Sequence, residues 1–319
     1  MIKTLAEIAE IINKANSVLL FCHVKPDGDT LGSAAALALA IGKTGKTADV
    51  VCDGDLPKNL NAFSFFKGIL KPEQVSKSYD LHIAVDVPTE ALLGTAWGIY
   101  SAGKNKAIVD HHMSNERYAD HVFISDEGAT CVIIGELIKI MGVECDKDIA
   151  EALLIGIITD TGCFTHINTD STTLDAAAKC IRCGADYKKT VYHCYLKQSK
   201  ARATFFARVM SSMRFYLDDK LAVIVIKKDE LAARGLTAED TVGMVDFPLS
   251  VEGVEVAVSL LETKNELYRV SFRSSGKVNA HDIAGEFGGG GHIFASGCVV
   301  KGPLEEVIEK IVRATDVNM

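Results

Sequence analysis

The sequence predicts an α/β fold in which a parallel sheet with helices on both faces precedes a helical connector and a smaller α/β domain. Two observations support the first part. Short apolar runs recur through the first half of the chain, and helix-like stretches separate them. Strands that are buried on both faces of a parallel sheet have this near-continuous apolar composition. A third observation supports the last part, because strand-like runs return after about residue 214.

The expected elements follow in chain order. Apolar runs predict the strands Ser17–His23, Thr47–Cys52, Leu81–Val87 and Lys106–Asp110. A helix is expected from Thr30 to Gly42, and helical patterns dominate from Cys131 to about Phe215, with Gly184 marking a helix end. The later strands are Leu221–Lys227, Val254–Leu261 and Leu267–Arg273, followed by a closing helix at Pro303–Ala314. We therefore expect a first domain at residues 1–190, a connector at 191–214 and a second domain at 215–319.

Composition and charge narrow the function classes. The chain has 319 residues, 48% of them hydrophobic and 24% charged, as in an ordinary globular protein. No apolar run approaches the roughly 20 residues that cross a bilayer. Charged residues interrupt the N-terminal stretch where a signal peptide would be apolar, so we expect a cytoplasmic protein without membrane association. The net charge of −8 argues against binding of long duplexes but permits short phosphorylated substrates.

Two of the nine cysteines, Cys180 and Cys183, form a C-x-x-C motif. No second pair stands at zinc-finger spacing, and the motif lies in a helical pattern where positions i and i+3 share a face. We interpret these residues as reduced cysteines of a helix.

The first cluster of functional interest holds His23, Asp27 and Asp29, directly after an apolar strand and before a helix. Open α/β sheets bind ligands at this carboxyl edge. Carboxylates two residues apart on a turn can face different metal ions. Taken alone the cluster is weak evidence, because Asp is also a common helix cap.

Three further apolar elements end in acidic or histidine residues. Asp86 ends a strand, where Asp is depleted, although taken alone it reads as a turn residue. The next strand ends in Asp110, His111 and His112. Imidazole is the commonest side-chain metal ligand and usually has a carboxylate partner. The alternative interpretation of this triplet is an exposed polar turn. Asp160 ends a strongly apolar segment at a predicted helix C-terminus, an unfavourable place for an anion unless a metal neutralises it.

Jointly the four clusters indicate a site for two divalent cations assembled from distant parts of the chain. Their ligands are oxygen and imidazole nitrogen without thiolate, which suits Mn²⁺, with Mg²⁺ or Co²⁺ as substitutes.

The triplet Asp110–His112, together with the other clusters, resembles the DHH phosphoesterase superfamily over nearly the whole chain. The resemblance implies that His23, Asp27 and Asp86 hold one metal ion. It implies that the second ion is held by Asp29, Asp86, His111 and Asp160, with Asp86 bridging. It also assigns His112 to the substrate phosphate and Asp110 to a supporting position behind the ligands. The catalytic residues expected on this basis are Asp86, Asp110 and His112.

The C-terminal region resembles the DHH-associated substrate domain through Phe272-Arg273-Ser274-Ser275 and the glycine run that ends in His292. Arg273 offers a planar fork for phosphate, and consecutive glycines let backbone N–H groups approach an anion. A flexible linker is the alternative, but patterned sequence flanks the run. The expected substrate-binding residues, besides His112, are Arg273, Ser274, Gly289, Gly290, Gly291 and His292.

Within the superfamily the chain is most similar to the compact bacterial oligoribonuclease (nano-RNase) and pAp-phosphatase type. This similarity implies a Mn²⁺-dependent phosphoesterase that hydrolyses short oligoribonucleotides and 3′-phosphoadenosine 5′-phosphate (pAp) with metal-activated water. RecJ-type exonucleases and family II inorganic pyrophosphatases share the metal motifs but differ beyond them. One departure concerns the segment after Asp160-Thr161-Gly162, where close relatives often carry an arginine and this chain has Cys163 to His166.

Three alternatives differ in how well the sequence fits them, and only the first stays open. The nearest is a phosphodiesterase for cyclic-di-AMP or linear dinucleotides such as pApA. A catalytically silent nucleotide sensor would lack a metal ligand, and none is missing. A generic nucleotide-binding protein would carry a glycine-rich loop after the first strand, where this chain has carboxylates. The expected partners are short RNA or DNA oligonucleotides or small nucleotides, and a homodimer is compatible with the sequence.

Overall fold

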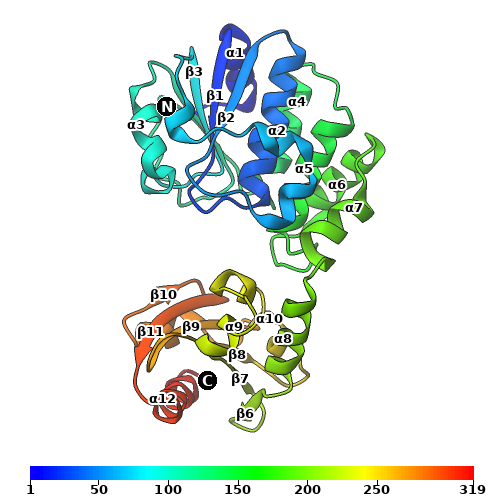
Figure 1. Ribbon diagram of the computed structural model, residues 1–319. Coiled ribbons are helices and arrows are strands. Elements are labelled where there is room, and N and C mark those ends of the chain that lie inside the picture. The colour runs from blue at the N-terminus through cyan, green and yellow to red at the C-terminus, as the bar shows by residue number, and fades with distance from the viewer. The chain divides into compact units, whose positions relative to one another are not determined.

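The computed structural model describes all residues 1–319, which divide into two compact units, Met1–Lys197 and Gln198–Met319 (Figure 1). Each unit has its own sheet and its own buried apolar core. The predicted α/β class is therefore confirmed. None of the helices combines the length and the apolar character needed to cross a membrane.

The sheet of the first unit has five parallel strands in the order β2-β1-β3-β4-β5. Their bounds are β1 Ser17–Phe21, β2 Thr47–Val51, β3 Leu81–Val85, β4 Lys106–Asp110 and β5 His121–Ile124. The direction of strand addition reverses between β1 and β3. The carboxyl ends of β1, β3 and β4 therefore lie beside one another at the point where sheets of this type bind ligands.

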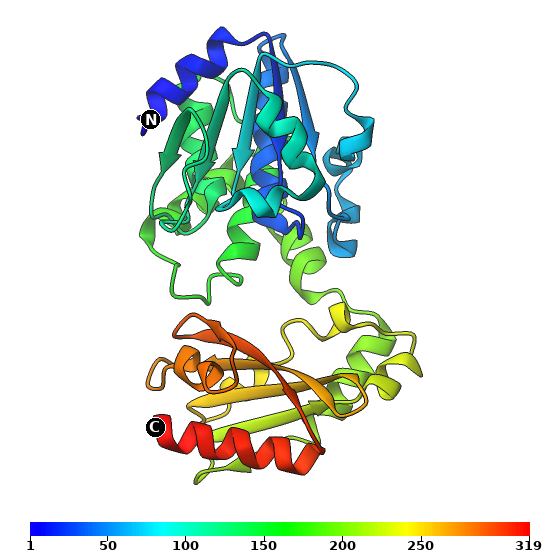
Figure 2. The same cartoon turned by 90° about the vertical axis from the view of Figure 1, so that its left-hand side faces the viewer.

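Helices cover both faces of this sheet. The helices of the unit are α1 Leu5–Lys14, α2 Gly28–Lys43, α3 Trp97–Ala102, α4 Thr130–Ile140, α5 Lys147–Asp160, α6 Ser171–Arg182 and α7 Tyr187–Val191. Helices α1, α2, α4 and α5 share one core with one face of the sheet, and α6 packs against α5. Helix α3 and short 3₁₀ turns cover the opposite face, which Figure 2 turns toward the viewer.

Helices α2 and α5 run close together, and the sequence explains both their ends and their contact. Asp27 caps α2 by accepting hydrogen bonds from the backbone N–H groups of Asp29 and Thr30, at 2.9 and 3.1 Å. A Cβ at Gly32 would overlap the carbonyl oxygen of Ala152, so glycine permits the close approach. This packing sets the first turn of α2 beside the last turn of α5.

The second unit holds a six-stranded mixed sheet in the order β10-β11-β9-β8-β7-β6. All neighbouring strands are antiparallel except β7 and β8, which are parallel. The strand bounds are β6 Arg214–Tyr216, β7 Leu221–Ile226, β8 Val256–Lys264, β9 Leu267–Ser274, β10 Gly290–Gly291 and β11 Ala295–Lys301.

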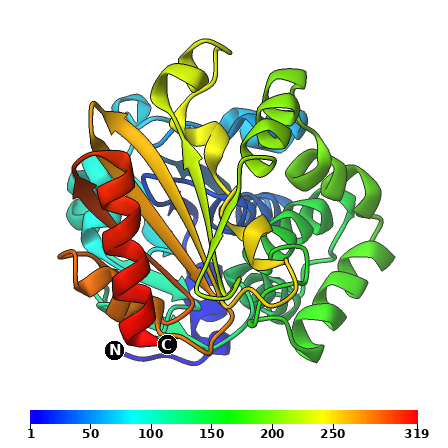
Figure 3. The same ribbon diagram turned by 90° about the horizontal axis from the view of Figure 1, so that it is seen from below.

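The helices of this unit are α8 Lys200–Met210, α9 Lys228–Ala232, α10 Asp246–Leu249, α11 Ala280–Gly285 and α12 Leu304–Asn318. Helices α11 and α12 bury their apolar sides against one face of the sheet, and Figure 3 shows α12, in red, in front of the sheet. Helices α8 and α9 contribute Phe205, Val209 and Leu231 to a separate core on β7.

Candidate metal centre

A first group of ligands gathers where β1 and β3 end. His23 follows β1, Asp27 caps α2 and Asp86 follows β3, and their ligand atoms lie within 4.8 Å of one another. His23 Nε2 is 3.6 Å from Asp27 Oδ2 and 3.8 Å from Asp86 Oδ2. This arrangement leaves space for one cation among an imidazole and two carboxylates.

A second group lies on the other side of Asp86. It consists of Asp29, His111 and Asp160, whose ligand atoms also lie within 4.8 Å of one another. His111 Nε2 is 3.8 Å from Asp160 Oδ2 and 3.6 Å from Asp86 Oδ1. The structure thus brings all six residues of the expected ligand set together, with the two Asp86 oxygens directed to different groups.

Asp86 is held in an unusual conformation at this junction. It is 3% exposed and has a φ of 59°, in the left-handed region that non-glycine residues rarely adopt. Its N–H donates to the carbonyl oxygen of Val109 at 3.1 Å, and the Thr130 hydroxyl donates to Oδ1 at 3.0 Å. Strained backbone of this kind collects at functional sites, where the surrounding structure enforces it.

The contacts of His111 define which nitrogen carries the hydrogen in the neutral ring. Nδ1 lies 2.9 Å from the carbonyl oxygen of Glu127, and because a carbonyl only accepts, Nδ1 carries the hydrogen. Nε2 then presents a lone pair toward Asp86 and Asp160, and it is buried without a hydrogen-bond partner. A lone pair facing carboxylates is repelled unless a cation lies between them. This observation fits a metal ion at the site.

The charge of the cluster leads to the same conclusion. Burial and the neighbouring carboxylates of Asp29 and Asp27 raise the pKa of Asp86 well above its usual range. Burial and the charge of Asp29 raise the pKa of Asp160 to about 7. These carboxylates cannot all be ionised near neutral pH without positive charge among them. Divalent cations supply that charge, and the carboxylate and imidazole donors suit hard or borderline ions.

The first turn of α4 orients Asp29. The backbone N–H of Thr130 donates to Oδ2 at 2.7 Å and that of Cys131 donates to Oδ1 at 2.9 Å. The N–H groups of a helix N-terminus have no partner within the helix, so they are suited to hold a carboxylate. Sequence reasoning missed this contact, because no motif marks residues 130 and 131.

Asn168 orients Asp160 and was also missed. Its side-chain amide donates to Asp160 Oδ2 at 3.1 Å, to the Asp160 carbonyl at 3.3 Å and to the carbonyl of Gly128 at 2.9 Å. It therefore connects the end of α5 to the loop that precedes α4. Outer hydrogen bonds of this kind fix the direction of a ligating carboxylate.

The segment that lacks the expected arginine folds back on α5. Cys163 and Phe164 both have positive φ, 55° and 68°, and they turn the chain sharply. His166 then lies against Gly162, with Nδ1 3.1 Å from the Asp160 carbonyl oxygen. An exposed imidazole thus stands in this segment, next to a candidate ligand.

Asp110 and His112 form a pair beside the ligands. Asp110 is fully buried, and its Oδ1 accepts from His112 Nδ1 at 2.8 Å and from the His112 N–H at 3.0 Å. Its Oδ2 accepts from Asn115 Nδ2 at 2.6 Å, a partner the sequence did not indicate. The hydrogen bond to Asp110 raises the pKa of His112. The His112 side chain is 41% exposed, so the far side of its ring is accessible to a ligand.

In the second unit, two of the expected substrate-binding residues make intramolecular contacts. Arg273 donates from Nε to Asp246 Oδ1 at 2.9 Å and from Nη1 to the carbonyl of Phe272 at 3.0 Å. Ser274 is 4% exposed, and its hydroxyl donates to the carbonyl of Val278 at 2.5 Å. Ser274 therefore holds the turn after β9, while Arg273 lies at the surface beside an acidic residue.

The glycine run packs directly on β11. A Cβ at Gly289 or Gly291 would overlap backbone atoms of that strand, and Gly290 pairs with Gly297. The Gly289 N–H already donates to the carbonyl of Ala284 at 2.9 Å. Close backbone packing therefore requires these glycines, and the exposed side chain that the run presents is His292.

One neighbour of the run, His281, was not singled out from the sequence. Its Nδ1 lies 2.9 Å from the carbonyl oxygen of Gly291.

Comparison with known families agrees with this geometry. Residues 17–157 match the DHH family, N-terminal domain, and residues 218–317 match the DHHA1 domain. The chain thus carries a DHH domain followed by a DHHA1 domain. The DHH match covers the strands whose ends carry the first three clusters, and the DHHA1 match covers Arg273 and His292.

Two curated relatives of this DHH chain have stated activities. The bifunctional oligoribonuclease and PAP phosphatase NrnA of Thermus thermophilus is 29% identical, over 96% of this chain and 92% of that protein. The cyclic-di-AMP phosphodiesterase PdeA of Listeria monocytogenes is 26% identical over 97% of this chain but only 49% of that protein.

Among solved structures, an exopolyphosphatase-related protein from Bacteroides fragilis superposes with a TM-score of 0.89 and 26% identity. The match covers 98% of the DHH chain and 95% of that protein. The fold therefore extends over essentially the full length of both chains.

Proposed function

We propose that this chain is a Mn²⁺-dependent phosphoesterase that hydrolyses short oligoribonucleotides and pAp. The observation that carries the proposal is Asp86, whose two carboxylate oxygens face two separate groups of ligands. Full-length similarity to an oligoribonuclease and PAP phosphatase supports the substrate class. The net charge of −8 favours short substrates over long nucleic acid.

The ligand groups suggest how two Mn²⁺ ions would be held, with Mg²⁺ or Co²⁺ as substitutes. His23, Asp27 and Asp86 would hold one ion, and Asp29, Asp86, His111 and Asp160 the other. Bound ions of this kind supply an activated water and neutralise charge on the phosphoryl group. No side-chain nucleophile is needed for such a reaction.

The protein's own contribution to the chemical step centres on His112. Asp110 accepts a hydrogen bond from Nδ1 and favours the charged ring, so Nε2 also carries a hydrogen. We propose that Nε2 donates this hydrogen bond to a phosphate oxygen as negative charge develops there.

In the second unit we propose that Arg273 and His292 bind a further phosphate or the nucleotide portion of the substrate. Asp246 now accepts from Arg273, so a substrate phosphate would compete with a carboxylate for the guanidinium. Ser274 and the glycines would support this region through the turn and the packing on β11. Arg273→Ala should impair substrate capture and selectivity more than the maximal rate.

A second candidate is a phosphodiesterase for cyclic-di-AMP or linear dinucleotides such as pApA. The similarity to the Listeria monocytogenes cyclic-di-AMP phosphodiesterase over nearly this whole chain favours it. The first candidate is preferred because its named relative matches along 92% of its length rather than 49%.

The test is a side-by-side measurement of hydrolysis on RNA of two to five nucleotides, pAp, pApA and cyclic-di-AMP. Rates are measured with Mn²⁺ and again after chelation, and the products are resolved by size. We expect metal-dependent release of mononucleotides from short RNA and of phosphate from pAp. Faster turnover of cyclic-di-AMP or pApA would favour the second candidate, and turnover that survives chelation would overturn the metal mechanism. A cytoplasmic location and a homodimer stay predictions, the latter open to light scattering.

A further inference from the structure

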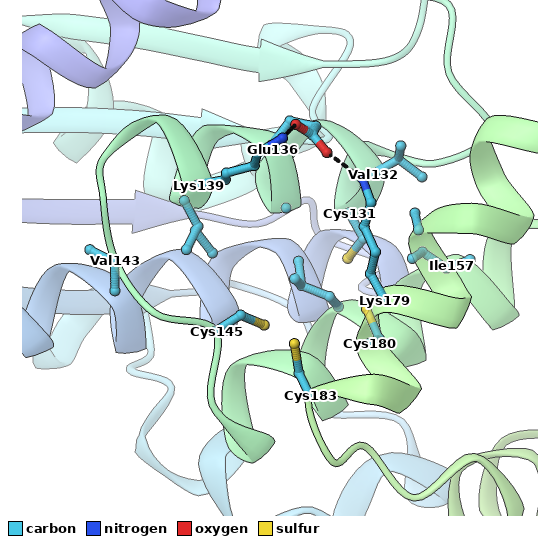
Figure 4. Close-up of a pocket in the computed structure, with 14 residues that line it drawn as sticks. Cys131, Val132, Glu136, Lys139, Val143, Cys145, Ile157, Lys179, Cys180 and Cys183 are labelled. Carbon is cyan, nitrogen blue, oxygen red and sulfur yellow. Dashed lines mark hydrogen bonds and ion pairs between the residues drawn. The ribbon is translucent and has the colours of Figure 1, made fainter.

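A cavity of about 290 Å³ lies among α4, α5, α6 and the loop that joins α4 to α5 (Figure 4). Its walls are largely apolar, yet four of the nine cysteines line it: Cys131, Cys145, Cys180 and Cys183. None of the four takes part in the proposed reaction. The cavity therefore gathers four thiols that the proposed reaction does not use.

Two of these thiols face each other. Figure 4 shows the sulfur atoms of Cys145 and Cys183 directed toward one another. Both residues are partly exposed, whereas Cys131 and Cys180 are 1% and 5% exposed. A small reagent can therefore reach the facing pair more readily than the other two thiols.

The backbone at both residues can adjust. Cys145 lies in the loop between α4 and α5, and Cys183 is the residue that caps the end of α6. Each has a left-handed glycine nearby, Gly142 with a φ of 73° and Gly184 with a φ of 99°. The Cys145 thiol has only a weak contact with the Asp146 carbonyl, at 3.9 Å. A disulfide needs Cα atoms about 4.4–6.8 Å apart, and a loop or the end of a helix can shift toward that separation more readily than the middle of an element.

We propose that Cys145 and Cys183 form a dithiol modification site, which low-molecular-weight disulfides convert to an intramolecular disulfide. The Cys183 thiolate attacks one sulfur of the small disulfide, breaks its S–S bond and releases one small thiol. Cys145 then loses its proton to water, attacks the Cys183 sulfur and displaces the second small thiol. Two protein thiols are oxidised, and one small disulfide is reduced to two thiols.

The order of the two steps follows from the surroundings of Cys145. Burial raises the pKa of its thiol to about 12, and the charge of the neighbouring Cys183 adds to that shift. The Cys145 thiol therefore ionises with difficulty, so we assign it the second, intramolecular attack, in which the mixed disulfide on Cys183 is already held close to it.

The position of the pair gives the modification a consequence for the metal centre. The segment between the two cysteines contains α5, which ends in Asp160, and Asn168, which orients that carboxylate. A disulfide would tie the two ends of this segment together. The thiol chemistry of Cys145 and Cys183 does not depend on the proposed function.

The test equilibrates the purified full chain in mixtures of reduced and oxidised glutathione, followed by acid quenching and peptide mass mapping. We expect a Cys145–Cys183 crosslink as the main intramolecular product. The equilibrium constant for forming this crosslink from oxidised glutathione should be roughly tenfold or more higher in the folded chain than in the chain unfolded in guanidinium. Folding raises the effective concentration of one thiol near the other.

Variants sharpen the outcome. Cys145→Ser should yield only a glutathione adduct on Cys183, and Cys183→Ser should give no crosslink. Cys298→Ser, in the second unit, is the matched control and should form the Cys145–Cys183 crosslink to the same extent as the chain without substitutions. Circular dichroism checks that each variant is folded. The two single variants each remove one of the two thiols, so each tests whether the crosslink needs that thiol. A crosslink between Cys180 and Cys183, or an equilibrium constant no higher than in the unfolded chain, would overturn the proposal.

Discussion

Asp86 joins the two ligand groups, and its backbone conformation offers a clean way to test that role. Asparagine tolerates positive φ nearly as well as aspartate, so Asp86→Asn should keep the fold while removing the charge between the groups. We expect the affinity for both metal ions to fall by more than the roughly 10–100-fold that loss of an outer partner costs. Turnover should be lost on every substrate. Calorimetric Mn²⁺ titration and circular dichroism check this, and near-normal Mn²⁺-dependent turnover would refute the site assignment.

Asp110 controls the protonation of His112, which leads to a prediction about pH. The hydrogen bond from His112 to Asp110 raises the pKa of the imidazole, so the charged ring is present below that raised pKa and lost above it. Asp110→Asn removes the anionic partner and lowers the pKa of His112. The alkaline fall of kcat/KM should therefore move to lower pH. An NMR titration of His112 provides the independent measurement, and an unchanged alkaline limb would show that His112 does not act as a donor.

Asn168 should matter for metal binding without touching the ion. Asn168→Ala removes the hydrogen bonds that orient Asp160, so we expect Mn²⁺ affinity to fall roughly 10–100-fold. Thr169→Ala is the matched control, because the Thr169 hydroxyl is buried without a hydrogen-bond partner. Calorimetry on both variants gives the comparison. Equal affinities for the two would mean that Asn168 only stabilises the loop.

The sequence indicated the ligands more readily than the residues that orient them. Asp86 alone reads as a turn residue, but four separate apolar elements that each end in Asp or His together indicate a site. Thr130 begins α4, and Asn115 and Asn168 lie in loops. All three are ordinary polar residues, and their roles arise only when distant segments meet. Such contacts leave no local signal in a single sequence.

At the level of elements, the contact between α5 and its neighbours sets the position of the ligands. A Cβ at Gly156 would overlap the Cys131 sulfur and come within 2.7 Å of Asp29 Oδ1. Gly156→Ala should therefore lower the free energy of unfolding by about 1–3 kcal/mol, as overpacking does, and weaken metal binding. Gly135→Ala on α4 is the control, because its Cβ would meet only Leu153 at an ordinary 3.6 Å. Chemical denaturation of both variants measures the loss of stability that overpacking causes. Equal free energies of unfolding for the two variants would contradict this account of the packing.

The strands of the first sheet were predictable because burial on both faces makes them uniformly apolar. The edge strand β5 escaped prediction, since it is four residues long and only one of them is fully buried. Strand β10 consists of two glycines, a composition that disfavours strands, and only its pairing with β11 defines it. The packing of the glycine run on β11 could not be predicted for the same reason, because the partner strand lies elsewhere in the chain, whereas the anion-binding role of the run stays a prediction.

At the scale of the whole molecule, the two units have separate cores, so their stabilities should respond separately to metal. All candidate metal ligands lie in residues 1–197, and none of the metal-binding groups includes a residue of 198–319. A ligand at 100 times its Kd stabilises the native state by about 2.7 kcal/mol. For a unit of this size that corresponds to roughly 5–10 °C in the thermal midpoint. Mn²⁺ should thus raise the midpoint of the first unit and leave that of the second unchanged.

Differential scanning calorimetry with Mn²⁺ and with chelator measures the shift, and amide hydrogen exchange assigns it to residues. Asp86→Asn should abolish the shift while the transition of the second unit stays where it was. Equal metal-induced protection in both units would show that metal binding is not confined to residues 1–197. Protection confined to the first unit but retained in Asp86→Asn would instead place the bound ion away from the junction of the two ligand groups.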